Sequence, residues 1–272
     1  MKIRLLGDHS RYHCGSKAVW EVLSREAARH GTLVSDDSFD LLVVNGEGSM
    51  HHGSAGCHRK IEAISEALGS GRRAMLINTV WQDNPPGLAS VLTGCERVTA
   101  RELMSARVLE AEGVRADLCL DLSYYRPIDP AEPHDFGGGV VMTDFWSNEF
   151  DTFAKVTGKW AARHAYVDMQ DWDWSRLVTS LKTAGLFVTG RHHGVYAACK
   201  ARTPFLALKG NTHKIEALGV TAGLEIPVFD TLKELRAAME APDPYHAQCD
   251  ALFDWMERQP VWTLFQGQSP SV

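Results

Sequence analysis

The sequence predicts an α/β protein with two Rossmann-like domains facing each other across a cleft. Short apolar runs alternate with amphipathic helical segments along all 272 residues, a pattern typical of parallel strands joined by crossover helices. Prolines and a glycine triplet interrupt this pattern at residues 126–139, which we interpret as an interdomain linker. Charged residues, histidines and glycines follow the strands, at the edge where open α/β sheets bind ligands. We therefore expect an N-terminal domain over residues 1–130 and a C-terminal domain over 131–272.

Each expected strand is a short apolar run, and a polar loop and a helical segment follow most of them. In the first half, strands are expected at 2–6, 39–44, 74–78, 97–100 and 116–120, and helices from Ser16 to Gly31, at 58–69 and from 101 to Gly113. In the second half, strands are expected at 140–143, 186–189, 203–208 and 223–229, a loop at 144–148, and helices at 175–184, from Gly194 onward, at 231–240 and at 244–257.

The composition argues against several classes of protein. Hydrophobic residues make up 44% of the chain and charged residues 23%, the balance of a soluble globular protein. The net charge of −6 argues against a general nucleic-acid binder. No apolar run approaches the roughly 20 residues that span a bilayer, and the N-terminus reads as a strand, so we expect a cytoplasmic protein without an integral membrane segment. The six cysteines form no C-x-x-C pair, which indicates neither a zinc knuckle nor a disulfide framework.

Residues 186–198 combine a strand, a cationic turn and the start of a helix. The turn contains Arg191, His192 and His193, and Gly194 opens the helical run that follows. The first N–H groups of a helix have no intrahelical partner, and the helix dipole favours negative charge there. An arginine adds a rigid fork that suits carboxylate or phosphate. The segment therefore predicts an anion-binding site, with a merely polar turn as the alternative.

A carboxylate between two glycines follows the second long strand. Glu47 stands in the segment Asn45-Gly46-Glu47-Gly48, and glycines at such a strand end permit close backbone approach. Glu47 is a candidate general base or acceptor-binding carboxylate, and a structural turn is an equal alternative. The nearby His51 and His52 lack the carboxylate–histidine helix motif of a metal site, so we expect no metal.

Polar and aromatic residues also follow the other expected strands. Trp81 and Gln82 follow strand 74–78 and suit an acceptor pocket, although packing in the core is an equal alternative for Trp81. Arg101 stands at a strand-to-helix junction, where anions collect. Asp121 adds a carboxylate at a further strand end, and Lys214 adds a cation after strand 203–208.

Several of these motifs, in this order and spacing, resemble the polysaccharide pyruvyl transferase family over about residues 10–220. The most specific are the R-x-H-G element at Arg191 to Gly194 and the K-I-E element from Lys214. The others are Asn45-Gly46-Glu47-Gly48-Ser49, Ala100-Arg101-Glu102 with Ser105, and Asp121-Leu122-Ser123.

The resemblance implies a GT-B-like fold and transfer of an enolpyruvyl-derived group from phosphoenolpyruvate to a sugar, forming a ketal. It also implies functional roles for Arg191, His193 and Arg101. Two elements depart from the family pattern. Residues His13-Cys14-Gly15-Ser16 stand where an N-x-G-D loop is common, and Asn45-Gly46-Glu47-Gly48 replaces a glycine triplet. These departures leave the acceptor in the first half open.

The leading hypothesis is a pyruvyl transferase acting on a sugar of a surface or capsular polysaccharide or its precursor. The alternatives are a GT-B-type glycosyltransferase that uses a nucleotide-activated sugar, such as a CMP-linked acidic sugar, and a non-catalytic binding protein. The expected partners are an anionic small-molecule donor and a carbohydrate acceptor, without cofactor, metal or nucleic acid.

The leading hypothesis assigns these residues to roles, and in the glycosyltransferase alternative Glu47 or Asp121 would be the base or the nucleophile. The expected catalytic residues are His193 as general acid, Arg191, and Glu47 or Asp121 as the group that accepts the hydroxyl proton. The expected donor-binding residues are Arg101, Arg191, His192, Gly194, Asn211, His213 and Lys214. The expected acceptor-binding residues are His13, Gly15, Ser16, Asn45, His51, His52, Trp81 and Gln82.

Overall fold

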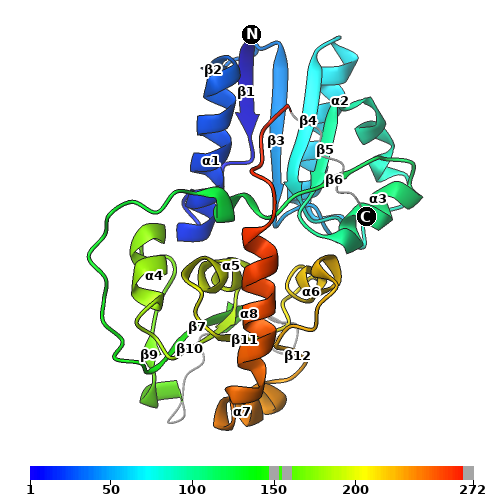
Figure 1. Cartoon of the computed structure of the whole chain (residues 1–272). Coiled ribbons are helices and arrows are strands. Elements are labelled where there is room, and N and C mark those ends of the chain that lie inside the picture. Colours follow the sequence, from blue (N-terminus) through cyan, green and yellow to red (C-terminus); the bar gives the residue numbers. More distant parts are fainter. Residues whose placement is uncertain (147–152, 155–160, 266–272) are drawn as a thin grey trace. The chain divides into compact units, whose positions relative to one another are not determined.

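The computed structural model describes residues 1–146, 153–154 and 161–265, and the chain divides into two compact units (Figure 1). Unit 1 contains Met1–His9, Val19–Tyr125 and Val261–Val272, the last described to Phe265. Unit 2 contains Ser10–Ala18 and Arg126–Pro260. The chain passes from unit 1 to unit 2 after Tyr125, residues 10–18 cluster with the second half and residues from 261 with the first, so neither unit is one continuous segment.

Unit 1 is built on a six-stranded sheet in the order β2-β1-β3-β4-β5-β6, and every pairing is parallel. The strands are β1 (Lys2–Leu6), β2 (Thr32–Val34), β3 (Leu41–Glu47), β4 (Arg73–Thr79), β5 (Arg97–Ala100) and β6 (Asp117–Leu118). Strand β2 pairs with one edge of β1, and β3 pairs with the other edge. The point where the strand order reverses therefore lies between β1 and β3, the place where open α/β sheets bind ligands.

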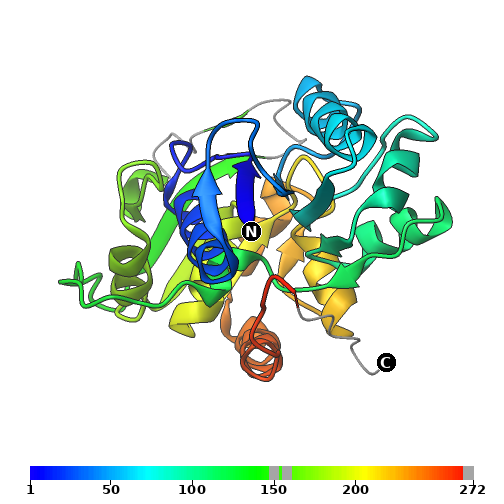
Figure 2. The ribbon, with the colours of Figure 1, turned by 90° about the horizontal axis from the view of Figure 1, so that it is seen from above.

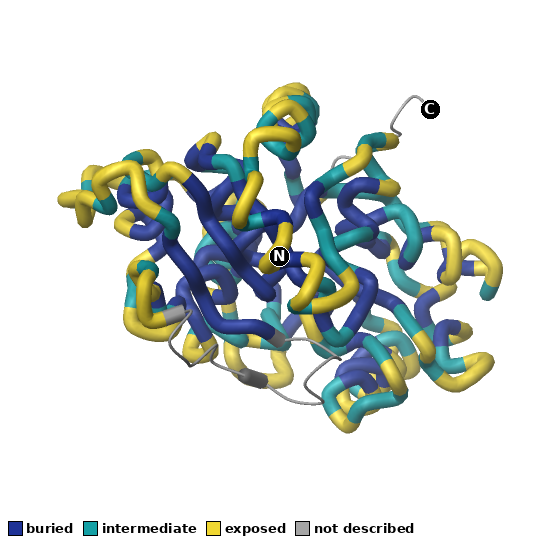
Figure 3. The backbone as a smooth tube through the Cα atoms, turned by 90° about the horizontal axis from the view of Figure 1, so that it is seen from below, coloured by how far each residue is buried: buried dark blue, intermediate teal, exposed yellow. Residues whose placement is uncertain are grey.

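Alternating residues of these strands pack against helices on opposite faces. Leu41, Val43 and Met75 face the core that includes α1 (Cys14–His30), whereas Leu42 and Leu76 face the other side. That second side is covered by α2 (Ala55–Gly69), the 3-10 helix η1 (Leu88–Gly94) and α3 (Leu103–Ala111). Because both faces are covered, the central strands β3 and β4 are buried except at Arg73, the first residue of β4 (Figure 3).

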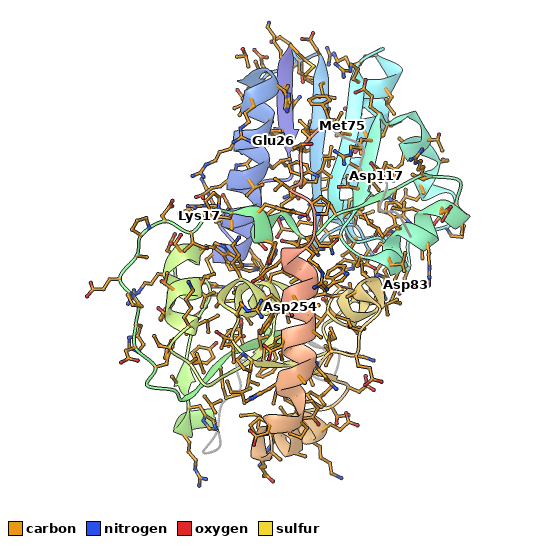
Figure 4. The ribbon with its side chains drawn as sticks, in the orientation of Figure 1. Lys17, Glu26, Met75, Asp83, Asp117 and Asp254 are labelled. Carbon is orange, nitrogen blue, oxygen red and sulfur yellow. The ribbon has the colours of Figure 1, made fainter. Side chains whose placement is uncertain are left out.

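The segment 261–265 completes the α1 side of unit 1. Trp262 and Leu264 belong to the core beside α1 and Met75 of β4. The Leu264 N–H donates to the carboxylate of Glu26 at 3.2 Å (Glu26 and Met75 are labelled in Figure 4). The helix expected from Ser16 to Gly31 is confirmed in α1, which begins two residues earlier, at Cys14. His13 Nδ1 accepts the Ser16 N–H at 3.3 Å.

Unit 2 is built on a second, mostly parallel sheet in the order β12-β11-β10-β7-β8, with β9 also paired to β7. Figure 2 shows the chain from above, with strands of this sheet in green to orange. The strands are β7 (Val140–Trp146), β8 (Phe153–Ala154), β9 (Ala165–Tyr166), β10 (Leu186–Gly190), β11 (Phe205–Leu208) and β12 (Val228–Phe229), of which β8 is antiparallel to β7. The order reverses between β7 and β10. The expected loop at 144–148 starts later than predicted, because β7 extends to Trp146, and residues 147–148 lie outside the described residues.

Alternation along β10 and β11 again separates two faces. Leu186, Val188, Leu206 and Leu208 share a core with Leu235 of α7 (Leu232–Glu240). The Phe205 ring lies 6.4 Å from that of Phe253 on α8 (Asp243–Glu257). The remaining helices of unit 2 are α4 (Trp174–Leu181), α5 (His192–Ala201), α6 (Glu216–Ala222) and α8 (Asp243–Glu257), together with the 3-10 helix η4 (Ala161–Arg163); the 3-10 helix η2 (Leu122–Tyr125) belongs to unit 1.

The segment 126–139, expected as a linker, is attached to the C-terminal unit. The backbone N–H groups of Asp129, His134 and Phe136 donate to hydroxyl groups of Ser175, Ser180 and Thr183, at 3.0, 2.8 and 2.8 Å. Such side-chain partners satisfy backbone donors that a strand or helix would otherwise pair. The segment is therefore an ordered strap along α4.

Candidate functional site

Arg191 lies at the carboxyl end of β10 and forms a bidentate ion pair with Asp144 of the neighbouring strand β7. Arg191 Nε donates to Asp144 Oδ1 at 3.0 Å and Nη2 donates to Oδ2 at 2.7 Å. The two side chains expose only 6% and 1% of their surface. Burial disfavours the charged guanidinium, but Asp144 outweighs this and raises the pKa of Arg191 above its usual value. The guanidinium predicted to bind a donor is thus already paired with a carboxylate.

The loop before α1 supplies aromatic rings to the same cluster. The Tyr12 ring lies over the Arg191 guanidinium at 5.2 Å, and the His13 and His193 rings meet edge-to-face at 4.9 Å. His193 stands in the first turn of α5, directly after the reversal point between β7 and β10. His13, predicted to bind the acceptor in the N-terminal domain, therefore lies in unit 2 beside the residues predicted to bind the donor.

Gly15 permits this approach of α1 to α5. A Cβ atom at position 15 would lie under 3.0 Å from the Cβ and Cγ atoms of His193, a distance that real Cβ atoms essentially never show. Gly15 and Ser16, both predicted to bind the acceptor, thus lie in the turn of α1 that packs on His193.

Replacing Gly15 with alanine is expected to destabilise the protein by about 1–3 kcal/mol, the usual cost of overpacking a close contact. The added methyl group must displace either the first turn of α1 or the His193 ring. Urea denaturation followed by tryptophan fluorescence measures the change. The matched control is Gly69→Ala at the end of α2, where a Cβ meets no atom within 4 Å. Equal stability of the two variants would contradict the contact.

The other predicted donor-binding residues gather around the start of α5 and the segment before α6. His192 Nδ1 lies 3.0 Å from the Lys214 carbonyl oxygen, which can only accept, so the proton is on Nδ1. Lys214 Nζ donates to Asn211 Oδ1 at 2.8 Å, and His213 is buried. Gly194 is required inside α5, because a Cβ there would lie under 3.0 Å from Thr189 Oγ1.

In unit 1, Glu47 ends β3 with an unusual backbone conformation. Its φ of 36° lies in the left-handed region that a residue with a side chain rarely adopts. The amide of Asn45 donates both to Glu47 Oε2 and to the Gly7 carbonyl, each at 3.1 Å. Glu47 and Asn45 are both buried. The structure therefore brings these two predicted residues together at the end of β3, beside the end of β1.

Arg101 and Asp121 form a buried ion pair elsewhere in unit 1. Arg101 Nη1 donates to Asp121 Oδ2 at 2.6 Å, and the side chains expose 1% and 0%. Asp121 Oδ1 accepts the Ser123 N–H at 2.9 Å, and Asn78 Nδ2 lies 3.4 Å from Oδ2. The pair connects the end of β5 to the segment after β6, and the roles of Arg101 in donor binding and of Asp121 as a base stay predictions.

The predicted residues near His51 belong to two loops that hydrogen-bond to each other. The His52 N–H donates to the Gln82 carbonyl at 2.8 Å, and His51 Nε2 lies 2.9 Å from the Gly48 carbonyl. Trp81 is fully buried in the core that faces α2, and its Nε1 donates to Glu112 at 3.2 Å. Of its two predicted roles, the structure thus favours packing for Trp81.

Sequence reasoning missed three polar residues that the structure places in these clusters. Asp144 was assigned to a loop, Lys60 lies within α2, and His9 follows β1.

Within residues 1–146, 153–154 and 161–265, the structure contains no group of three or more His, Cys, Asp or Glu side chains that could hold a metal ion. None of the helices in that part of the chain is long and apolar enough to cross a membrane.

Comparison with known proteins shows similarity at the level of the fold. The chain matches no family model and no curated protein sequence. A candidate UDP-N-acetylglucosamine 2-epimerase of Listeria monocytogenes is similar in structure, with a TM-score of 0.59 and 9% identity over 95% of this chain and 90% of that one. The UDP-GlcNAc 2-epimerase of Neisseria meningitidis, bound to UDP-GlcNAc, gives a TM-score of 0.55 and 12% identity over 94% and 97%.

An uncharacterised protein of Klebsiella pneumoniae gives a TM-score of 0.55 and 10% identity, over 80% of this chain and 86% of that one. At such identities, the likeness concerns the fold alone. The predicted fold class is confirmed, since the chain has two Rossmann-like α/β units like those of the GT-B-like epimerases.

Proposed function

We propose that this chain is a sugar-modifying transferase whose unit 2 binds a phosphate-bearing donor at the first turn of α5. The observation on which the proposal rests is the pair of imidazoles, His13 and His193, at the amino end of a helix that follows the reversal point of the sheet. A helix start at this point of an open α/β sheet is a favourable place for phosphate. Lys214, in the segment beside His192, adds positive charge.

The first candidate reaction is pyruvyl transfer from phosphoenolpyruvate, supported by the R-x-H-G and K-I-E motifs. His193 gives a proton to the methylene carbon, and a first sugar hydroxyl attacks the central carbon. The bond from that carbon to the phosphate oxygen then breaks, phosphate leaves, and a second hydroxyl of the sugar attacks the same carbon, which completes the ketal. Of the two hydroxyl protons, one leaves with the phosphate and the other passes to a carboxylate. Because Asp121 is paired with Arg101, we propose Glu47 as the carboxylate that accepts this proton. Arg191, held by Asp144, is a positioning residue at the entrance to α5.

The second candidate is a reaction on a nucleotide-linked sugar. It is favoured by the fold, because both epimerases similar in structure bear names that include a UDP-linked sugar. The same helix start would bind the phosphates of such a donor.

Ligand binding and turnover together test the proposal. Thermal-shift measurements with phosphoenolpyruvate, UDP, CMP and UDP-GlcNAc identify the donor, because a ligand that binds only the folded protein raises the apparent stability. Phosphate release in the presence of phosphoenolpyruvate and a panel of glycans, with a product heavier by a pyruvyl group, is expected for the first candidate. Stabilisation by UDP or CMP alone favours the second, and no stabilisation by any of the four contradicts both.

Replacing His193 with glutamine is expected to lower kcat by about 10²–10⁴-fold, the usual contribution of a general acid. The matched control is His58→Gln on α2, an exposed histidine whose loss should leave kcat unchanged. Circular dichroism verifies that both variants are folded. Equal kcat for the His193 and His58 variants would remove His193 from the mechanism.

A further inference from the structure

Lys60 of α2 has its ammonium group buried against the turn at the end of β3. The residue exposes only 6% of its surface, which is rare for lysine unless the charge is paired. Its Nζ donates to Ser49 Oγ at 2.6 Å, and a second N–H is shared between the Asn45 carbonyl at 2.6 Å and the Gly46 carbonyl at 3.2 Å, which leaves one N–H for a further acceptor. Lys60 therefore binds the backbone of the turn that contains Glu47.

The same ammonium group determines the tautomer of His9. Lys60 Nζ lies 3.1 Å from His9 Nε2, and a charged ammonium can only donate. Nε2 is therefore the unprotonated nitrogen, and the ring proton is on Nδ1. Burial lowers the pKa of His9, and the opposing effect of the Glu47 carboxylate does not restore it, so His9 is neutral at pH 7. Being half-buried, His9 offers an N–H donor at the end of β1.

Glu47 is held in place by the same contacts. Glu47 has a left-handed backbone with a φ of 36°. A residue with a side chain keeps this strained conformation only where several surrounding contacts hold it. The hydrogen bonds from Lys60 to the carbonyls of residues 45 and 46, and from Asn45 to Glu47 Oε2, provide this restraint. In addition, Asn45 Oδ1 is buried and has no hydrogen-bond partner among the described residues. A buried acceptor of this kind needs an explanation, and a donor group of a bound ligand would satisfy it.

We propose that His9 and Glu47 bind a hydroxyl of a neutral carbohydrate, and that Lys60 is the positioning residue for both. His9 Nδ1–H donates a hydrogen bond to the oxygen of the sugar hydroxyl, and the Glu47 carboxylate accepts a hydrogen bond from the O–H of the same hydroxyl. This pairing of one donor with one charged acceptor suits a sugar hydroxyl, whereas an anionic ligand would be repelled by Glu47. The cluster lies where the strand order of unit 1 reverses, between β1 and β3. The inference rests on the proposed function, for which it identifies the acceptor residues.

The charge state of Lys60 is expected to make sugar binding depend on pH. Burial lowers the pKa of Lys60 to about 8, although Glu47 opposes this. As the pH rises through 8, the ammonium loses its proton, the restraint on the His9 tautomer is released, and sugar affinity is expected to fall. Other charged or titratable groups act on Lys60 or His9, namely Asp8, Cys57, Arg59 and Arg101.

The test measures neutral-sugar binding and donor binding separately. Methyl glycosides of glucose, galactose, mannose and N-acetylglucosamine are screened by saturation-transfer NMR, and the best is titrated by calorimetry. His9→Phe, Glu47→Gln and Lys60→Met are each expected to weaken its binding at least about tenfold, the effect of losing a charge-assisted hydrogen bond. The thermal shift given by the donor should stay unchanged. The matched control is Arg59→Met, an exposed cation next to Lys60 on α2.

The His9 tautomer is read from ¹⁵N chemical shifts of its imidazole. The wild-type protein is expected to show the Nδ1–H form, and Lys60→Met a shift towards Nε2–H. The inference is overturned if the wild-type protein binds the donor but no neutral sugar, if His9→Phe and Glu47→Gln bind the sugar as tightly as Arg59→Met, or if wild-type His9 is in the Nε2–H form. Loss of sugar binding in the variants without any donor binding in the wild type would support the inference and contradict the proposed function.

Discussion

Replacing Asp144 with alanine is expected to lower the free energy of unfolding by about 3–5 kcal/mol, because it leaves a buried guanidinium without its counter-charge. The Arg191 side chain exposes 6% of its surface and donates hydrogen bonds to both carboxylate oxygens of Asp144. At such burial, solvent compensates little for the lost carboxylate. Chemical denaturation monitored by circular dichroism measures the change.

An exposed ion pair in the same unit provides the control. Lys209 and Asp230 expose 41% and 67%, so Asp230→Ala is expected to change stability by less than about 1 kcal/mol. The double variant Asp144→Leu with Arg191→Met should recover much of the lost stability, because no unpaired charge remains. If Asp144→Ala costs no more than Asp230→Ala, the buried pair contributes nothing, and Arg191 is available for an anionic ligand after all.

The fold could be predicted because its central strands are buried on both faces. Runs such as Leu41 to Val44 and Leu186 to Thr189 are apolar at every position or nearly so, which indicates a parallel sheet between helices. The strands β2 and β9 were not predicted, because three or two residues carry too little pattern. Helix α6 was also missed: Gly219 and Gly223 weaken its helical signal.

The candidate site could be predicted only in part. Arg191 and His193 stand at a strand-to-helix junction, and the chemistry of such junctions is visible in sequence. Their partners are not visible. Asp144 followed what reads as the end of a strand at Thr143, and a lysine within an amphipathic helix, such as Lys60, normally reads as solvated. Sequence order also could not show that the loop of His13 packs with residues near 190.

Replacing Arg101 with methionine is also expected to cost about 3–5 kcal/mol, since Asp121 then stays buried without its cation. The pair has almost no exposed surface, with 1% for Arg101 and 0% for Asp121. Adding Asp121→Asn to the variant removes the orphaned charge and should restore much of the stability. Heat or urea denaturation of the two variants beside the wild type measures both effects.

The double variant also decides between the two roles of Arg101. If Arg101 binds the donor, as the R-E-x-x-S motif predicts, the donor affinity of the folded double variant falls at least about tenfold, the effect of losing a charge-assisted contact. If the pair is structural, as its burial indicates, the affinity stays within about twofold, the effect of a substitution away from the ligand. Calorimetric titration with whichever donor stabilises the wild type gives the answer. A tenfold loss in a variant of restored stability would contradict the structural role, because only contact with the ligand would then remain as its cause.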